Sequence, residues 1–142
     1  MTGANLRHEK IAMNLAAALH SHLAGGPCRV YKSDVKVRVA DDFYYPDIAV
    51  RFGERDGDGY AMSDPVVIVE VLSPSTQRHD RGDKRYAYGR LPSLREYARV
   101  SRDEMKVDVF AGDEPVTRLM DAEERLTLAS LGFSPSLAEL YP

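Results

Sequence analysis

The most hydrophobic segment of the chain is VVIVEVL, residues 66–72, and it holds a single charged residue, Glu70. Such a run of apolar and mostly β-branched residues predicts a central strand that is covered on both faces. An ionised carboxylate in a buried strand destabilises the fold by several kcal/mol unless a metal ion or a cation pairs with it. We therefore expect Glu70 to have a partner.

A second carboxylate lies at the start of another apolar run. In YYPDIAV, residues 44–50, Asp47 directly follows a proline and precedes three apolar residues. Two acids on neighbouring strands, with a basic segment after the second, provide the minimum needed to hold a divalent cation against a phosphate. The central hypothesis from the sequence is a metal site formed by Asp47 and Glu70.

The size and composition of the chain are those of one globular domain. It has 142 residues, of which 44% are hydrophobic and 29% are charged. No apolar run approaches the roughly 20 residues of a membrane span, and the N-terminus lacks the apolar region of a signal peptide. We expect a soluble, cytoplasmic protein with no membrane partner. The single cysteine, Cys28, excludes an intrachain disulfide and is interpreted as a packing residue.

Positive charge is concentrated in one segment. The formal net charge is −3, which argues against non-specific coating of nucleic acid, but residues 77–102 hold eight Lys or Arg against three acids. These charges could be solvated helix faces. Their position directly after Glu70 instead favours a surface that a polyanion approaches.

The periodicity of the chain predicts a mixed order of helices and strands. Residues 5–23 have helical spacing, with Asn5 as a cap, and strands are expected from Cys28 to Val39, over 44–52 and over 66–72. A helix is expected over 77–89, a hairpin over 97–110 and a short strand near 116–119. This order predicts an α/β (α+β) domain with a mixed sheet protected by helices.

Four motifs carry a resemblance to a known family: YPD (45–47), VEVLSPST (69–76), DRGDK (80–84) and SLREY (93–97). With them the chain resembles the Uma-two family of candidate restriction endonucleases, a branch of the PD-(D/E)XK phosphodiesterase superfamily. The likeness runs from about residue 8 to residue 141. It implies one restriction-endonuclease-like domain over 1–142, with a mixed β-sheet flanked by helices. Family members usually have a further segment upstream of the first long helix, and this chain starts almost at that helix.

The resemblance also implies ligands and catalytic groups. Asp47 and Glu70 match the acids that bind Mg²⁺ or Mn²⁺, and Val71 matches a position whose backbone carbonyl completes the ligands. The superfamily motif places a lysine two residues after the glutamate, where this chain has Leu72. Lys84 of the DRGDK motif is interpreted as a substitute supplied by the next helix.

Two further residues are assigned supporting roles. Asp80 lies four residues before Lys84 on the expected helix and could steady its ammonium; an ordinary surface pair of the two is the alternative. His8 matches a histidine at the start of the family's first helix and could position a ligand or a water. An exposed histidine in a first helical turn is the alternative interpretation.

The reaction implied is metal-dependent hydrolysis of DNA phosphodiester bonds, with phosphates contacted by Arg78, Arg81 and Arg85. A homodimer is compatible with it because one small site cuts one strand. An inactive nuclease-fold module that binds DNA or a protein partner is the alternative, favoured by Leu72. Acid-base hydrolysis of a sugar by the same carboxylates leaves the basic segment without a role.

Overall fold

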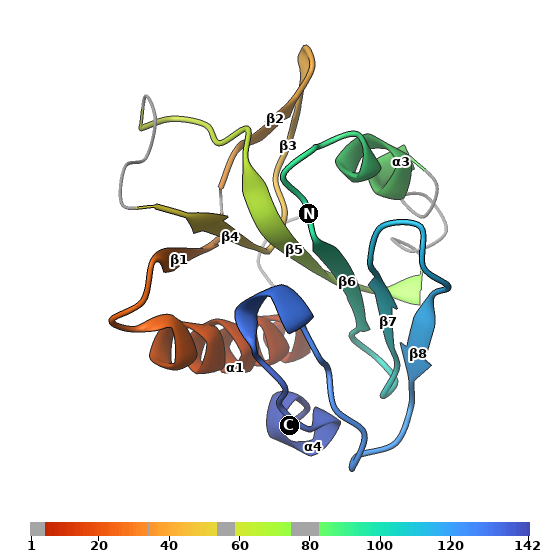
Figure 1. The fold of residues 1–142 in the computed structure, drawn as a ribbon. Coiled ribbons are helices and arrows are strands. Elements are labelled where there is room, and N and C mark those ends of the chain that lie inside the picture. The colour runs from red at the N-terminus through yellow and green to blue at the C-terminus, as the bar shows by residue number, and fades with distance from the viewer. Residues whose placement is uncertain (1–4, 34, 54–58, 75–82) are drawn as a thin grey trace.

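The computed structural model describes residues 5–33, 35–53, 59–74 and 83–142, and its elements form a mixed main sheet with helices on both faces and a separate two-stranded hairpin (Figure 1). The helices are α1 (Leu6–Leu23), α3 (Asp83–Gly89), the 3₁₀ helix η1 (Ala129–Leu131) and α4 (Leu137–Leu140). The strands are β1 (Cys28–Lys32), β2 (Val37–Val39), β3 (Asp42–Tyr44), β4 (Ile48–Phe52), β5 (Pro65–Leu72), β6 (Glu96–Ser101), β7 (Val107–Phe110) and β8 (Thr117–Leu119).

The main sheet has six strands in the order β1-β4-β5-β6-β7-β8. Strands β5 and β6 are parallel, while the other neighbours pair antiparallel, so the predicted mixed sheet is confirmed. Strand β5 is interior and almost wholly buried, as its apolar sequence predicted. A separate antiparallel hairpin is formed by β2 and β3.

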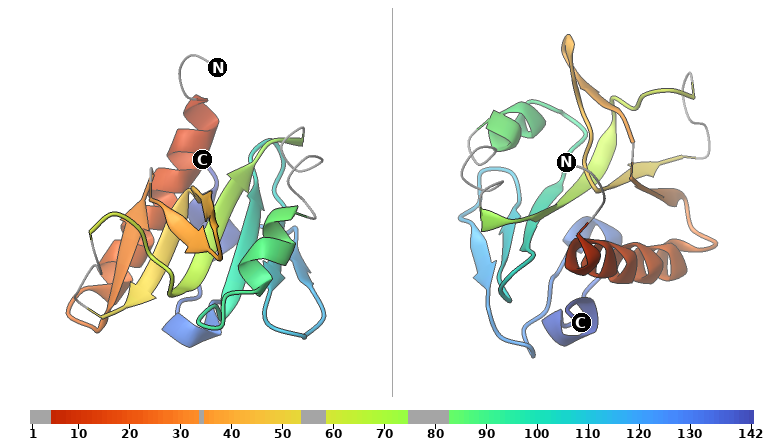
Figure 2. Two further views of the ribbon diagram at one scale, coloured as in Figure 1. Left: turned by 90° about the horizontal axis from the view of Figure 1, so that it is seen from above. Right: turned by 180° about the vertical axis from the view of Figure 1, so that it is seen from behind.

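Helices α1 and α4 cover one face of the main sheet, while α3 and the β2–β3 hairpin lie over the other (Figure 2). The helix predicted over 5–23 is confirmed as α1. Asn5 caps it as predicted, because its side chain accepts a hydrogen bond from the backbone N–H of His8. The buried face of α1 packs against alternate residues of the central strands, among them Val69 and Val71. The intervening residues, such as Ile68, pack on the opposite side with Tyr88 of α3.

Two segments that were predicted as single strands are each divided between two strands. The strand expected from Cys28 to Val39 is two strands in different sheets, because Ser33 takes a φ of 59° and breaks the extended chain after β1. The strand expected over 44–52 is also divided between β3 and β4. Pro46 lies in the break, where its missing N–H cannot support a ladder. Asp47 consequently sits in a bend immediately before β4.

The second half of the chain follows the predicted order. Strands β6 and β7 form the expected hairpin, and β8 lies where the short strand was expected. The helix expected over 77–89 is seen as α3 from Asp83; residues 77–82 of that prediction lie outside the described residues. Among the helices described, none combines the length and the apolar character that a membrane span needs.

Candidate active site

Glu70 is buried near the C-terminal end of β5, with 3% of its surface exposed, and α3 supplies two of its partners. The ammonium Nζ of Lys84 lies 3.3 Å from Glu70 Oε2, and the hydroxyl of Tyr88 donates to Glu70 Oε1 over 3.1 Å. Lys84 and Tyr88 are four residues apart, so both project from the same face of α3. The sequence prediction that Lys84 comes from the next helix to the buried acid agrees with this geometry.

Asp47 meets Glu70 through the pairing of β4 with β5. The antiparallel register places Ile48 opposite Val69, and one further step along it places Asp47 opposite Glu70. The backbone N–H of Val71 donates to Asp47 Oδ2 over 2.8 Å. The two carboxylates are therefore brought close together near the end of β5, and the metal site that they are predicted to form stays a prediction.

His8 reaches the same site from the first turn of α1. Its Nε2 lies 3.1 Å from Asp47 Oδ1, and this hydrogen bond is the main reason that the pKa of His8 is raised. The side chain is only about a quarter exposed, so His8 is not the solvated histidine of the alternative interpretation. Each oxygen of Asp47 thus has a donor, one from α1 and one from β5.

Burial dominates the electrostatics of Glu70. It raises the pKa of Glu70 from 4.5 to about 7; the ammonium of Lys84 opposes this change, and the negative charge of Asp47 adds to it. Burial also raises the pKa of Tyr88, which keeps its hydroxyl protonated and able to donate. Burial beside Asp47 therefore makes the ionised form of Glu70 unfavourable, and a cation bound between the two carboxylates would stabilise it.

The raised pKa of Glu70 predicts an unusual dependence of stability on pH. Because Glu70 binds its proton more tightly in the folded chain than in the unfolded chain, metal-free stability should fall as pH rises from about 4.5 to about 7. Glu70→Gln should remove this dependence. At pH 8 it should raise the free energy of unfolding by up to roughly 3 kcal/mol, the value of such a shift. Chemical denaturation at pH 5 and pH 8 in EDTA measures both effects.

The exposed Glu114 provides the control. Glu114→Gln changes the net charge equally and should leave stability unchanged at both pH values. A Glu70→Gln protein that is less stable than wild type at pH 8 would show that the ionised carboxylate is well satisfied without metal, contrary to the electrostatics above.

The donors at the site fit a hard divalent cation. Asp47 and Glu70 offer carboxylate oxygens, and Val71, whose N–H bonds Asp47, is positioned to add a backbone carbonyl. Within the described ranges, no group of three or more His, Cys, Asp or Glu side chains is placed to hold a metal. Mg²⁺ suits such a sparse site, because it commonly uses one or two carboxylates and completes its shell with water and phosphate oxygens.

Leu72 occupies the position at which the superfamily motif has lysine, and it is buried. Side chains alternate along a strand, so residue 72 has the same orientation as Glu70 and a lysine there would point toward the acid. Lys84 supplies an ammonium at that acid from a different element. The positive charge that the superfamily motif places on β5 is thus supplied to the site by α3.

Arg85 of α3 places its guanidinium 4.1 Å from the centre of the Phe110 ring of β7. Asp80, Arg78 and Arg81 lie outside the described residues.

Two residues near the site were not identified from the sequence as functional. Tyr88 was not singled out, yet its hydroxyl donates directly to Glu70. Arg99 of β6 is the register partner of Glu70 and is 5% exposed. The sequence pattern around Arg99 resembles that around Glu70, because Arg99 is a charged residue inside the largely apolar run YARVS (97–101).

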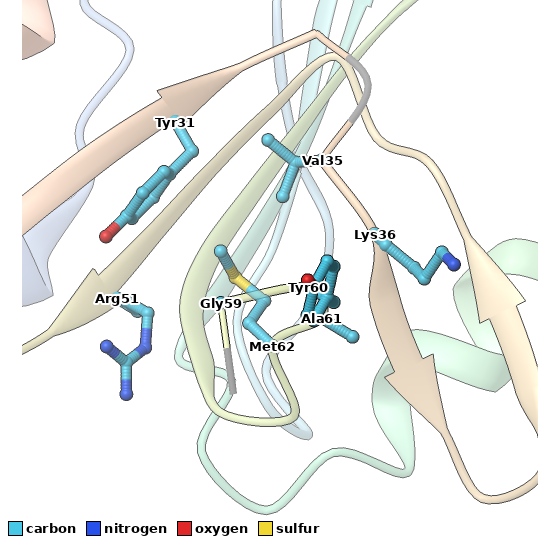
Figure 3. Close-up of a pocket in the computed structure, with 8 residues that line it drawn as sticks. All are labelled: Tyr31, Val35, Lys36, Arg51, Gly59, Tyr60, Ala61 and Met62. Atoms are coloured by element: carbon cyan, nitrogen blue, oxygen red, sulfur yellow. The ribbon is translucent and has the colours of Figure 1, made fainter. Parts of the chain in front are cut away.

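A cavity of about 170 Å³ is lined by strands β1 and β4 and by the segment leading to β5 (Figure 3). Tyr31 and Arg51 line it from β1 and β4, and Tyr60 and Met62 line it from the segment before β5. Asp47, Glu70 and Lys84 are not among its lining residues, so this cavity is separate from the candidate active site.

Comparison with known proteins agrees with this geometry. A family model, Uma2, described as "Putative restriction endonuclease", matches residues 1–138. The Synechocystis protein slr1290, uncharacterized, is 33% identical over 99% of this chain and 77% of its own length. A second uncharacterized Synechocystis protein, sll1609, is 29% identical over 68% of this chain and 58% of its own length.

A solved structure shares the fold. The crystal structure of a protein from Anabaena variabilis, described as a putative nuclease belonging to DUF820, superimposes with a TM-score of 0.83. The match covers 96% of this chain and 81% of the Anabaena chain, at 16% sequence identity. The likeness at this identity establishes the fold, and the predicted fold class is confirmed.

Proposed function

The chain belongs to the Uma2 family, and on that basis we propose that it is a metal-dependent endonuclease that hydrolyses phosphodiester bonds in DNA. The observation that supports this most strongly is the meeting of Asp47 and Glu70 at the end of β5, with Lys84 on the second acid. Two carboxylates, one of them buried, provide a cation site, and the lysine adds a positive group for a phosphate.

The ion itself would be held by the carboxylates of Asp47 and Glu70 and the carbonyl of Val71. When bound, Mg²⁺ or Mn²⁺ lowers the pKa of a bound water and neutralises charge on a phosphoryl oxygen. Burial in β5 and the hydroxyl of Tyr88 fix the Glu70 carboxylate, so that its oxygens are already oriented before the ion arrives.

Lys84 and His8 perform different tasks in this proposal. The ammonium of Lys84 donates hydrogen bonds beside Glu70, where it orients the attacking water and stabilises charge on the non-bridging phosphate oxygens. His8 contacts Oδ1 of Asp47 and so fixes the orientation of that carboxylate as a ligand. DNA is the proposed substrate because the basic segment 77–102 follows the site directly.

A plasmid assay tests the proposed activity. The purified protein should convert supercoiled plasmid to nicked or linear DNA with Mg²⁺ or Mn²⁺, and EDTA should stop the reaction. A preparation that binds Mn²⁺ but never cleaves DNA under these conditions would contradict the proposal.

The inactive nuclease-fold module remains the second candidate, because Leu72 replaces the motif lysine. Metal binding separates the two functions. For the nuclease we expect Mn²⁺ to bind in titration calorimetry and to raise the melting temperature. A ligand at 100 times its Kd stabilises a protein by about 2.7 kcal/mol. No heat of binding and no thermal shift with Mn²⁺ would favour the inactive module.

A further inference from the structure

A second site lies beside the acidic pair, in a cavity of about 190 Å³ on the α3 side of β6, β7 and β8. Its walls carry four cationic side chains and a single carboxylate, together with two apolar residues. The charged lining residues are Arg85, Arg99, Lys106, Asp108 and Arg118. We call this cavity the arginine pocket.

Sheet register joins the arginine pocket to the acidic pair. Glu70 of β5 pairs with Arg99 of β6, Arg99 with Asp108 of β7, and Asp108 with Arg118 of β8. Side chains at paired positions point to the same face, so these residues form one row across the sheet. The row starts at the acids of the proposed metal site and ends in the pocket.

The cations of the pocket are held in place by the protein. Arg118 makes a double hydrogen bond to Asp108, with distances of 2.7 and 3.0 Å, which fixes its guanidinium plane. Arg85 stacks over Phe110, with its guanidinium 4.1 Å from the centre of the ring. Arg99 is buried in the floor, and Lys106 is paired with the exposed Glu104 at 3.3 Å. Cations fixed around a small cavity favour a compact anion with several acceptor oxygens.

We propose that the arginine pocket binds a phosphate group, and that this group is a backbone phosphate of the same DNA strand that is hydrolysed at Asp47 and Glu70, two or three nucleotides from the cleaved bond. The second part rests on the proposed function. Strands are about 4.8 Å apart, so the pocket at β6 and β7 lies roughly 5–10 Å from Glu70. With a rise of about 3.4 Å per nucleotide, a phosphate two or three nucleotides from the cleaved bond would lie over it.

Direct titration tests phosphate binding. Inorganic pyrophosphate, as the probe, is titrated into the metal-free full chain in a calorimeter. Arg118→Gln removes a half-exposed guanidinium and should weaken binding at least fivefold. Arg99→Lys keeps the buried charge but loses the planar fork, and should weaken binding about tenfold.

Arg125→Gln is the matched control, because Arg125 is exposed on the C-terminal segment and lies outside the pocket. It should bind pyrophosphate like wild type, which excludes a general effect of net charge. The melting temperature of each variant is measured alongside. If Arg118→Gln is folded and binds pyrophosphate as tightly as wild type, the pocket proposal is wrong.

Oligonucleotides identify the source of the phosphate. Binding of a labelled oligonucleotide in EDTA is followed by anisotropy, with either a 5′-hydroxyl or a 5′-phosphate end. If a backbone phosphate occupies the pocket, Arg118→Gln weakens binding of both oligonucleotides equally. The slope of log K against log[salt] then decreases by about 1. A loss seen only with the 5′-phosphorylated oligonucleotide would assign the pocket to a terminal phosphate.

The two proposals can fail separately. If the wild-type protein cleaves plasmid and the pocket variants bind pyrophosphate as tightly as wild type, the phosphate pocket is rejected and the nuclease proposal is retained. Pyrophosphate binding that depends on Arg118, in a protein that never cleaves DNA, would reject the nuclease and leave the phosphate site.

Discussion

Asp47→Ala and Glu70→Ala should each abolish magnesium-dependent nicking of plasmid DNA, while the circular dichroism spectrum should remain that of the folded protein. Each change removes a carboxylate ligand of the proposed ion, whose charge stabilisation is worth several kcal/mol. At 1.36 kcal/mol per factor of ten, the expected loss is about 10³-fold or more. The measurement is the initial rate of nicking at saturating Mg²⁺, compared with wild type.

The stability of these variants separates a catalytic loss from a folding loss. Glu70 is buried and its ionised form is unfavourable without metal, so Glu70→Gln should fold at least as well as wild type at pH 8. It should nevertheless be inactive. Both alanine variants retaining wild-type cleavage would reject the assigned site.

Lys84→Ala is expected to lower turnover about 10²- to 10³-fold, the usual effect of removing one positioned donor that stabilises transition-state charge. Metal affinity should change far less. The ammonium of Lys84 opposes the rise in the pKa of Glu70, so its removal leaves Glu70 more protonated at pH 7 and weakens metal binding modestly. Raising the pH to 8.5 should restore metal binding but not turnover. Rates and Mn²⁺ titrations at both pH values make this comparison.

Lys10→Ala is the control for Lys84→Ala, since Lys10 is an exposed lysine of α1. It should leave the rate unchanged. An unchanged rate in Lys84→Ala as well would return Lys84 to the role of an ordinary ion-pair partner of Glu70.

The sequence predicted the acids because both are charged residues in otherwise apolar runs. Burying an unpaired carboxylate is unfavourable in any fold, so a carboxylate in an apolar strand predicts a partner whatever the details of the fold. Lys84 was predicted from the family resemblance, and helical spacing explains why Tyr88, four residues later, shares its face of α3. Their contact with Glu70 required the position of α3, which periodicity alone cannot give.

The breaks between strands were less predictable. Alternation of apolar and polar residues continues from β1 into β2, and nothing in that pattern indicates that Ser33 adopts a left-handed conformation. Pro46 did mark the second break, because proline cannot continue a ladder. The contact of His8 with Asp47 joins residues far apart in sequence, and only the family resemblance pointed to it.

Arg99 shows where reasoning from composition fails. The basic residues of segment 77–102 were predicted to form a surface that a polyanion approaches. Arg99 is one of them, but it lies buried within an apolar strand, as Glu70 does. The argument applied to the acid therefore applies equally to this arginine. It would have predicted a buried cation next to the site.

Anomalous diffraction from a crystal soaked in Mn²⁺ is the most direct measurement of the metal site. We expect one strong manganese peak at the end of β5, bonded to carboxylate oxygens of both Asp47 and Glu70, with Lys84 beside the second acid. A well-ordered site whose carboxylates bind no manganese, with any bound ion lying elsewhere, would contradict the proposal that these two acids share one divalent cation.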